Sequence, residues 1–596
     1  MDDNRLSALD RSTSIGLILI ALFQGVALYA MHLAVENTHW QATDQRWLSA
    51  LYSITIVVPA FYLISMVRLR DRINLIPLLL TPLLFWMGWH LGWATSVPEA
   101  PYRNTSPLMA SFSMTVGVAM LILALFFRSS AFSGTWPKAY QPLLNYSWEF
   151  ALTIAQVSLF IGVFWVILGL WGALFAAIGI DFFERVFYKP VFVYPVTWLM
   201  LGIAVVMIRN RFRFLASVRL MCEALIKTLL PLVALVILLF FAVLMWTGLE
   251  PIWDTGKAAQ ILMALMLTLL LFFNAVFHQT HSNPPYPGWL RNTVLVAVVL
   301  LPIGSLLAAW ALWLRIDQYG LSLDRLWAGL LQALVATFTF SYSVIILWRR
   351  KAALPGIHRV NRWLALLVAS VLILVNTPLA DISHWSAQHQ VKRLLDGHTA
   401  VEDFDFDYVL YRLGRPGKLA LQELAESEFA QTHPELKRRV EFHIKQAQSG
   451  NTGSLMDTDD LGELAQQFRI RPETATMPES LLVLLAKQEL MCLNQPDPCI
   501  AVRIDDDPSI QWLIYDQYTF QAKAYAERNQ AWHWVGDLVS LGSEQKHHAE
   551  ECLHSYSYSK LQRIPESLNI YRTGSCLHFL RPSLEFVRQQ LSAAEN

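Results

Sequence analysis

The sequence predicts a polytopic membrane protein, an all-α bundle of about eleven transmembrane helices followed by an α+β extracytoplasmic domain. Of its 596 residues, 55% are hydrophobic and only 15% are charged, whereas soluble domains have about 25% charged residues. The apolar residues occur in runs long enough to cross a hydrocarbon layer of roughly 30 Å. The last run ends at Ala380, and the chain from Asp381 to Asn596 contains no further candidate span.

These boundaries predict a transmembrane helical domain at residues 1–380 and a second domain at residues 381–596. Each expected span is a mostly apolar run of helical length. The eleven runs are residues 14–35, 47–67, 73–95, 107–127, 148–178, 190–208, 222–246, 258–278, 292–314, 325–348 and 361–380.

The distribution of Lys and Arg between alternate loops predicts the orientation of these spans, because cytoplasmic loops are enriched in both residues. Seventeen Lys and Arg residues fall on the side of the N-terminus, and seven fall on the other side. We therefore expect a cytoplasmic N-terminus. An odd number of spans then places residues 381–596 on the outer side of the membrane, which in a Gram-negative bacterium is the periplasm.

The C-terminal domain is expected to be helical at residues 381–491 and β-rich at residues 492–596. Apolar residues recur at helical spacing in the first part, including Leu461–Phe468, and alternate with polar residues in the second. Ser583 is expected to cap a final helix. The expected strands, which make a mainly antiparallel sheet, are Ile500–Ile504, Gln511–Tyr515, Gln521–Glu527, Trp532–Leu538, Ser567–Tyr571 and Cys576–Leu580.

Four cysteines follow the membrane part, and an even number in an oxidising compartment predicts disulfides. Cys492 and Cys499 flank a turn-forming Asn-Gln-Pro-Asp-Pro segment, and closing so short a loop would stabilise the fold by roughly 2.5 kcal/mol. Two identical Cys-Leu-His triplets follow, for which a disulfide between the cysteines is favoured and free thiols or a zinc site are the alternatives. The triplets supply Cys552, His554, Cys576 and His578.

Within the membrane, charged residues are expected only within two turns of the ends of the spans, where long side chains reach the interface. This pattern disfavours proton- or sodium-driven transport, which usually places acidic or basic groups deep in the bilayer. Neutral polar groups remain as candidates for lining a cavity, although packing against a neighbouring helix is the simpler role for each. They are Gln24, His90, Gln156 and Asn274.

Small residues form one stripe along the span at 148–178, and such a stripe lets neighbouring helix backbones approach closely. The sequence therefore predicts a central packing helix here, with a sliding helix of a transporter as the alternative. The stripe consists of Ala155, Ser158, Gly162, Gly169, Gly172, Ala176 and Gly179.

Several classes of function lack support in the sequence. The formal net charge is zero, which argues against nucleic acid as a partner because phosphate binding needs a basic surface. No nucleophile elbow, P-loop, dinucleotide-binding glycine pattern or zinc-protease motif is present, so an enzyme is disfavoured and no cofactor is expected. Arginines beside aromatic residues at Arg209–Phe214 and Trp348–Lys351 predict contact with anionic lipid headgroups.

The segment after the last span resembles a family of bacterial polytopic inner-membrane proteins of unknown function, the YhgE-like group. The resemblance rests on Phe406-Asp407-Tyr408 and on Leu413-Gly414-Arg415-Pro416-Gly417, where Pro416 replaces a tyrosine of the family pattern. An imperfect Gln-x-x-x-Arg-Leu pattern precedes them at residues 388–395. The resemblance implies an inner-membrane location and this architecture, and it implies no catalytic residue.

Taken together, these features favour a transport protein for a small or lipidic molecule whose outer domain is a gate or binds an envelope protein. A non-transporting envelope sensor or assembly factor is the first alternative, and a membrane enzyme acting on lipid-linked substrates is the second. Transport predicts a polar cavity within the bundle, whereas a solidly packed bundle favours the sensor.

Overall fold

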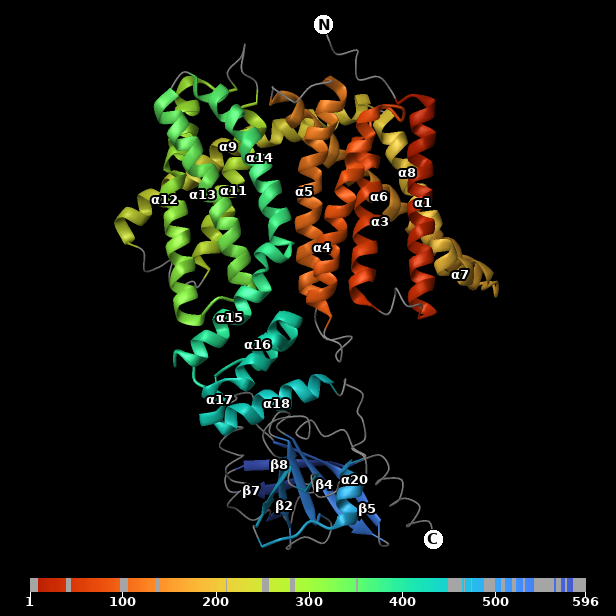
Figure 1. Ribbon diagram of the computed structural model, residues 1–596, viewed down its shortest axis with the longest axis vertical. Helices are drawn as coiled ribbons and strands as arrows, with labels where there is room; N and C mark the ends of the chain where they lie inside the picture. The colour runs from red at the N-terminus through yellow and green to blue at the C-terminus, as the bar shows by residue number, and fades with distance from the viewer. Residues whose placement is uncertain are drawn as a thin grey trace. The chain divides into compact units, whose positions relative to one another are not determined.

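A computed structural model shows two compact units (Figure 1). The first contains residues 1–97 and 102–421, and the second contains residues 98–101 and 422–596. The predicted division at residue 380 stays a prediction. The structure describes residues 9–38, 44–96, 106–133, 140–210, 212–248, 257–278, 285–349, 352–401, 403–448, 464–465, 467–472, 474–486, 499–504, 510–516, 521–528, 531–540, 562–563, 570–573 and 576–582.

The first unit confirms the predicted membrane bundle, because its described residues form eleven helical spans of sufficient length and hydropathy. Most extend beyond the predicted runs, since the helices continue into more polar sequence at their ends. The spans are α1 (Arg11–Glu36), α3 (Gln45–Ser65), η1 with α4 (Arg72–Leu79 and Leu80–Thr95), α5 (Ser106–Ser133), α6 (Gln141–Ala176), α8 (Pro190–Asn210), α9 (Phe212–Thr247), α11 (Ala258–Val276), α12 (Gly288–Tyr319), α13 (Leu323–Arg349) and α14 (Ala353–Val375).

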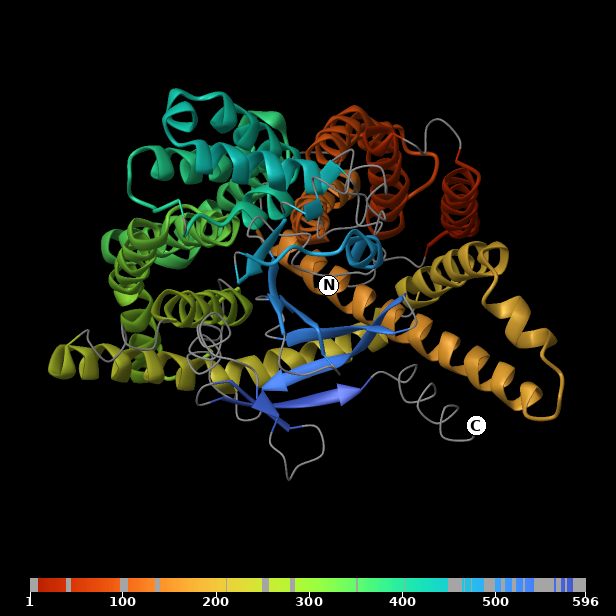
Figure 2. The same ribbon diagram turned by 90° about the horizontal axis from the view of Figure 1, so that it is seen from below.

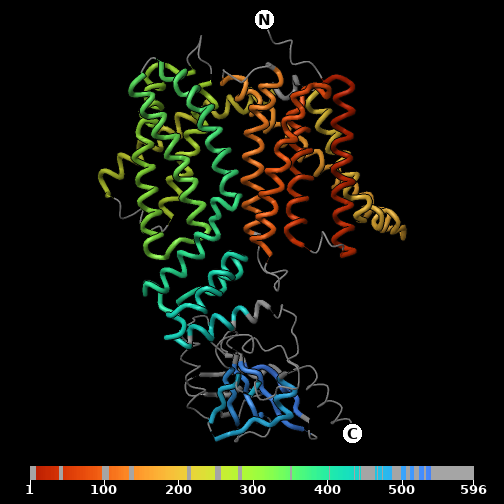
Figure 3. The backbone as a smooth tube through the Cα atoms, viewed as in Figure 1, coloured from red at the N-terminus to blue at the C-terminus, as the bar shows by residue number. Residues whose placement is uncertain are grey.

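The spans form two sets, which can be followed in Figure 3 as the red-to-orange helices and the green helices. Helices α1, α3, α4, α5, α6 and α8 bury two clusters of apolar side chains, and α9, α11, α12, α13 and α14 bury a third. Helices α5 and α14 meet where the sets adjoin, and Asn376 Nδ2 donates a hydrogen bond to Thr115 Oγ1 there at 2.8 Å. We call this boundary the seam.

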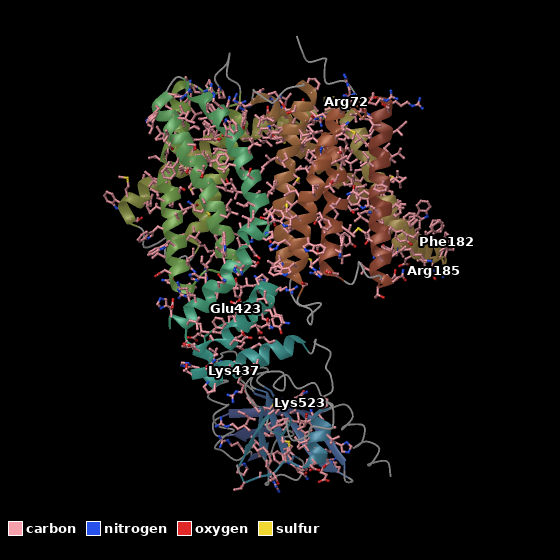
Figure 4. All side chains as sticks on the ribbon, viewed as in Figure 1. Arg72, Phe182, Arg185, Glu423, Lys437 and Lys523 are labelled. Carbon is pink, nitrogen blue, oxygen red and sulfur yellow. The ribbon has the colours of Figure 1, made fainter. Side chains whose placement is uncertain are left out.

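The two longest helices, α6 and α9, extend away from the other spans (Figure 2). Helix α6 leads into α7 (Phe182–Phe187), whose Phe182 and Arg185 lie at the edge of the unit (Figure 4). The predicted packing role of the small-residue stripe is wrong for its central part. A Cβ placed on Gly162 meets no described atom within 4 Å, and Ala155 and Ser158 are exposed, so this face is available to lipid.

Helices α3 and α4 approach each other most closely through two glycines one turn apart, Gly88 and Gly92. A Cβ on Gly88 would lie 2.7 Å from the carbonyl oxygen of Ser49, and one on Gly92 would lie 2.4 Å from that of Gln45. This small-x-x-x-small spacing allows backbone contact between membrane helices. The sequence contains the pattern Gly-Trp-His-Leu-Gly, and the resulting contact fixes the position of His90 between the two glycines.

Beyond the spans, the first unit continues through η3 (Pro378–Ala380), α15 (Ile382–Leu395), the π-helical turn η4 (Tyr408–Arg412) and the start of α16 (Arg415–Glu426). The second unit confirms the expected mixture of short helices and a mainly antiparallel sheet. Its helices are α17 (Glu428–Thr432), α18 (Pro434–Gln448) and α20 (Glu479–Ala486).

The sheet has eight described strands in the order β1-β2-β3-β4-β5-β8-β7-β6, and only β1 and β2 pair in parallel. Helix α20 packs on one face, where Trp532 Nε1 donates to Ser480 Oγ at 3.1 Å. The strands are β1 (Phe468–Arg471), β2 (Cys499–Arg503), β3 (Trp512–Asp516), β4 (Gln521–Arg528), β5 (Ala531–Ser540), β6 (Gln562–Arg563), β7 (Ile570–Thr573) and β8 (Cys576–Pro582).

Two features of this unit differ from the prediction or lie beyond the described residues. The expected helix at Leu461–Phe468 is replaced at its end by strand β1, because pairing with β2 satisfies the backbone groups of this segment. The helix expected after Ser583 lies outside the described residues.

Candidate functional site

A groove of about 500 Å³ runs between α3 and α5 on the membrane-spanning part of the first unit. Its lining on α3 extends from Gln45 to Ile64, and its lining on α5 extends from Met109 to Ala124. At about 1.5 Å per residue the α3 wall is roughly 28 Å long, close to the thickness of a hydrocarbon layer. The groove therefore follows the direction in which a lipid chain lies in a bilayer.

The groove wall is mostly apolar, and its edge is open to the surroundings. Ile56 and Met109 line it with exposed fractions of 43% and 36%. The polar Ser53 side chain is already engaged, since its Oγ donates to the carbonyl of Ser49 at 2.7 Å. A Cβ on Gly117 meets no described atom within 4 Å, so this glycine leaves space in the groove. Such a surface suits a hydrocarbon chain and offers little to a polar solute.

A buried ion pair lies beyond the end of the groove at Ile64. Arg128 on α5 contacts Glu149 on α6 at 2.6 Å, and their side chains are 10% and 13% exposed. Arg128 also donates to the carbonyl of Ile64 at 2.8 Å. The sequence assigned Arg128 to a loop, but α5 continues to Ser133 and carries it inside the protein.

A second arginine, Arg209, reaches the same end of α3. Its guanidinium donates to the carbonyls of Leu63 and Met66 at 2.9 and 2.6 Å. Cations at a helix C-terminus are stabilised by the exposed carbonyl groups and the helix dipole. The end of the bundle that contains Arg128 and Arg209 also carries Arg72, labelled in Figure 4, and we call it the cation-rich end.

The opposite end of the groove also has a paired arginine. Arg46 makes two hydrogen bonds to the Asp44 carboxylate, at 3.0 and 2.8 Å, and its guanidinium lies 5.2 Å from the centre of the Trp89 ring. Because Asp44 and Trp89 both interact with it, Arg46 is held beside the start of α3 at the level where the groove begins.

The four polar residues predicted to line a cavity have separate surroundings. Gln24 is fully buried and donates to the carbonyl of Ile56 at 3.0 Å, which joins α1 to α3. Gln156 is half-buried on α6, and His90 contacts Asp381. Asn274 lines a different cavity, at the seam. The described contacts therefore do not bring the four together.

Asn274 belongs to a closed ring of hydrogen bonds that joins α11, α13 and α14. Its Nδ2 donates to the Tyr342 hydroxyl at 2.8 Å, and that hydroxyl donates to Asn361 Oδ1 at 2.5 Å. Asn361 Nδ2 donates back to Asn274 Oδ1 at 2.7 Å. Each group in the ring both donates and accepts, so the bonds reinforce one another. The sequence marked only Asn274, because its partners are distant in the chain.

After the last span, Asp381 connects the start of α15 to α4. One carboxylate oxygen accepts hydrogen bonds from the backbone N–H groups of Ser383 and His384 at 2.9 and 3.1 Å. The other lies 3.4 Å from His90 Nε2. Burial alone raises the pKa of Asp381, but the hydrogen bond and charge of His90 and the two backbone donors outweigh it, so the pKa lies below its ordinary value.

The motif that carries the family resemblance fixes the chain beyond α15 against the spans. Tyr408 OH accepts from the backbone N–H of Leu323 at 2.7 Å and lies 3.2 Å from Ser386 Oγ. Gly414 has a φ of +65°, and a Cβ there would lie 2.3 Å from the carbonyl oxygen of Ala94. Arg415 stacks over Trp93 at 5.5 Å. The tyrosine, glycine and arginine of the motif therefore all make structural contacts, which define what we call the junction.

We expect substitution of Asp381 to separate its two roles. Asparagine caps a helix about as well as aspartate, so Asp381→Asn keeps the cap and removes the charge beside His90. Since the folded pKa lies below 3.8, the stabilisation by the carboxylate is complete above that pH and is lost as the pH falls through the folded pKa. The variant should unfold at a lower temperature at neutral pH, by the equivalent of about 1 kcal/mol.

Thermal unfolding measured across a pH series checks this expectation. Asp381→Ala removes the cap as well and should cost about 1 kcal/mol more than Asp381→Asn. An Asp381→Asn protein with the same acid dependence as the wild type would show that the contact with His90 contributes nothing.

The predicted cysteine sites lie largely beyond the described residues. Cys492, Cys552 and His554 are outside them, and only the backbone of Cys576 and His578 is described, in β8. Cys499 is fully buried in β2. The disulfides and the alternative zinc site both stay predictions.

Comparison with known proteins gives one match. Residues 72–424, more than half of the chain, match the profile of a family described as Domain of unknown function (DUF4153). The chain belongs to the DUF4153 family. No curated protein and no solved structure matches it.

The DUF4153 match begins with η1 and ends within α16. It therefore includes the seam and the junction, together with the α4 and α5 walls of the groove. Helices α1 and α3 precede the matched residues, and the sheet follows them. The groove thus combines α3, from outside the matched region, with helices of the DUF4153 domain.

Proposed function

We propose that this protein handles a lipidic molecule in the membrane, and that the groove between α3 and α5 holds a hydrocarbon chain of that molecule. The observation that carries the proposal is the groove itself, an apolar, lipid-accessible space of about 500 Å³. Volumes of this size are typical of ligand sites, at roughly 300–1,000 Å³. The activity that fits best is transport or transfer of a lipidic molecule.

The groove has a closely packed wall and a preformed opening, and both features favour binding of a ligand. Contact of α3 with α4 through Gly88 and Gly92 gives it a closely packed back wall. Between α3 and α5, however, Gly117 leaves the space open. Packed walls around a preformed opening lower the cost of ordering a bound chain.

Transport of a polar solute has less support. Such a site needs several polar groups that converge on one cavity, and Gln24, His90 and Asn274 instead have different partners. A second candidate, an envelope sensor or assembly factor, is favoured by the junction. There, hydrogen bonds from Ser386 and Gln390 to the carbonyl of Leu321 tie α15 to the loop between α12 and α13.

The proposed location is a bacterial inner membrane with a cytoplasmic N-terminus and residues 381–596 in the periplasm. The excess of Lys and Arg on one side and the resemblance to the YhgE-like group support this topology, and the disulfides predicted for this domain agree with it. We further propose that exposed residues of the cation-rich end, such as Arg72, contact anionic headgroups and that the C-terminal domain binds an envelope protein.

Filling the groove tests the proposed function. Gly117→Phe places a ring in the open space and also replaces glycine inside a helix, so the fold should tolerate it. We expect wild-type protein purified from membranes to retain lipid in the groove through a detergent wash, and Gly117→Phe to lose this groove-bound lipid. Native mass spectrometry counts the retained lipid and identifies its class.

Met114→Phe is the matched control, because Met114 lies on α5 with 74% exposure and does not line the groove. It should retain lipid like the wild type. Equal retention by all three proteins would overturn the proposal. If Gly117→Phe loses lipid but a lipid-transfer assay in vesicles shows no activity in the wild type, the sensor or assembly role replaces transport.

A further inference from the structure

The seam contains a second cavity, of about 490 Å³, at the cation-rich end of the first unit. It lies among α5, α6, α9, α11, α13 and α14, entirely within residues that match the DUF4153 family. Apolar side chains such as Phe126, Trp148 and Phe338 make up most of its wall. Leu271, also in the wall, is 60% exposed, so the cavity opens toward the surrounding bilayer.

One wall of this cavity is polar and rigid. Asn274, Tyr342 and Asn361 line it, and their ring of hydrogen bonds fixes the three side chains. Tyr140 lines it from the start of α6, in the first helix set. Its ring stacks on that of His358 in α14, with the ring centroids 5.0 Å apart. These contacts give the cavity a preformed shape.

Tyr140 adds a hydroxyl beside this ring of hydrogen bonds, where it accepts a hydrogen bond from the Asn361 side chain and makes a longer contact with Asn274. Its oxygen lies 3.5 Å from Asn274 Oδ1, longer than the 2.5–3.0 Å usual for hydrogen bonds between oxygens. Asn274 Oδ1 already accepts the closer bond from Asn361 Nδ2 at 2.7 Å. The Tyr140 hydroxyl can therefore donate its proton to a bound acceptor in exchange for this long contact, while its oxygen keeps the bond from Asn361.

The charged side chain in the cavity wall determines which kind of ligand group can bind there. Arg362 lines it beside Asn361, and the described lining residues include this one cation and no carboxylate. A guanidinium next to a hydroxyl donor recognises phosphate or carboxylate oxygens. In a mostly apolar cavity, these groups suit an anion attached to a hydrocarbon chain.

We propose that the seam cavity binds an anionic lipid, with its phosphate or carboxylate group against Arg362 and Tyr140 and its chain along the apolar wall. The site is separate from the groove between α3 and α5, and it recognises its ligand through the headgroup. A lipid bound here contacts α5 and α6 on one side and α11, α13 and α14 on the other. It therefore joins the two helix sets.

Lipid titration of the detergent-solubilised full chain, followed by native mass spectrometry, tests the proposal. Phosphatidylglycerol is the anionic probe, phosphatidylcholine is the zwitterionic probe, and glycerol phosphate tests the headgroup without chains. We expect the wild type to bind phosphatidylglycerol most tightly. Arg362→Gln should weaken this binding about tenfold, the usual effect of losing a charged hydrogen-bond partner.

Arg359→Gln is the matched control, because Arg359 lies on the same helix, is exposed and does not line the cavity. It should leave binding nearly unchanged. Equal weakening by Arg359→Gln and Arg362→Gln would mean general attraction to a cationic surface and would overturn the proposal. Preference for phosphatidylcholine would do the same, and tight binding of glycerol phosphate would replace the lipid by a free phosphate compound.

Ala365→Phe gives an independent test that leaves the charge in place. Ala365 lines the cavity, so a phenylalanine there should displace the chain and weaken binding of phosphatidylglycerol as Arg362→Gln does. Unchanged binding in Ala365→Phe would exclude the cavity as the site. Gly117→Phe should retain the anionic lipid, so the seam proposal and the groove proposal fail or succeed separately.

Discussion

Glu149→Gln is expected to lower the stability of the membrane unit by about 3 kcal/mol, because removing one member of a buried ion pair leaves the other charge uncompensated. Arg128 is the remaining charge; it contacts Glu149 at 2.6 Å with little exposure of either side chain. Its bond to the carbonyl of Ile64 reduces the loss but does not neutralise the charge. Thermal unfolding in detergent measures the change.

Two comparisons show whether the effect comes from burial of the charge. Replacing both residues, as Arg128→Met with Glu149→Leu, removes both charges and should recover most of the stability. Asp324→Asn breaks a pair with Arg412 in which Asp324 is 82% exposed, so it should cost less than about 1 kcal/mol. A loss of stability no greater in Glu149→Gln than in Asp324→Asn would contradict the account of this pair.

Gly414→Ala is expected to release the junction from α4. Its φ of +65° is unfavourable for any residue with a Cβ, and that Cβ would lie 2.3 Å from the carbonyl oxygen of Ala94. We expect a local cost of about 3 kcal/mol, which corresponds to roughly a hundredfold faster hydrogen exchange. The amides to follow are Tyr408, bonded to Asp405, and Leu323, bonded to Tyr408.

Gly397→Ala separates the conformational cost from the close approach. Gly397 has a φ of +73°, but a Cβ there meets no described atom within 4 Å. This variant should therefore lose only about 1 kcal/mol, with no change in exchange at Leu323. If Gly414→Ala behaves like Gly397→Ala, the contact with Ala94 is not what holds the junction.

The sequence predicted the membrane spans well because long apolar runs depend only on local composition. It placed the ends less well, since polar residues such as Arg128 were counted as loop although α5 continues through them. The strands at Gln521–Arg528 and Ala531–Ser540 followed from alternation of apolar and polar residues. Strand β1 did not, because its pairing with β2 depends on residues distant in the chain.

The candidate sites were harder to predict for the same reason. Asn274 was recognised as an unusual polar residue, but its partners Tyr342 and Asn361 come from other helices, and a single sequence carries no signal that joins them. His90 was singled out as well, yet its partner Asp381 lies beyond the last span. The pattern of Gly88 and Gly92 was available in the sequence and indicates the close contact of α3 with α4.

The most direct test of lipid handling is an experimental structure of the full chain in particles that retain its native membrane lipids. The account predicts continuous chain-shaped density between α3 and α5, beside Ile56 and Gly117, that is absent from Gly117→Phe and present in Met114→Phe. A groove that is empty or closed in the wild type, with α5 packed directly on α3 along its length, would contradict it.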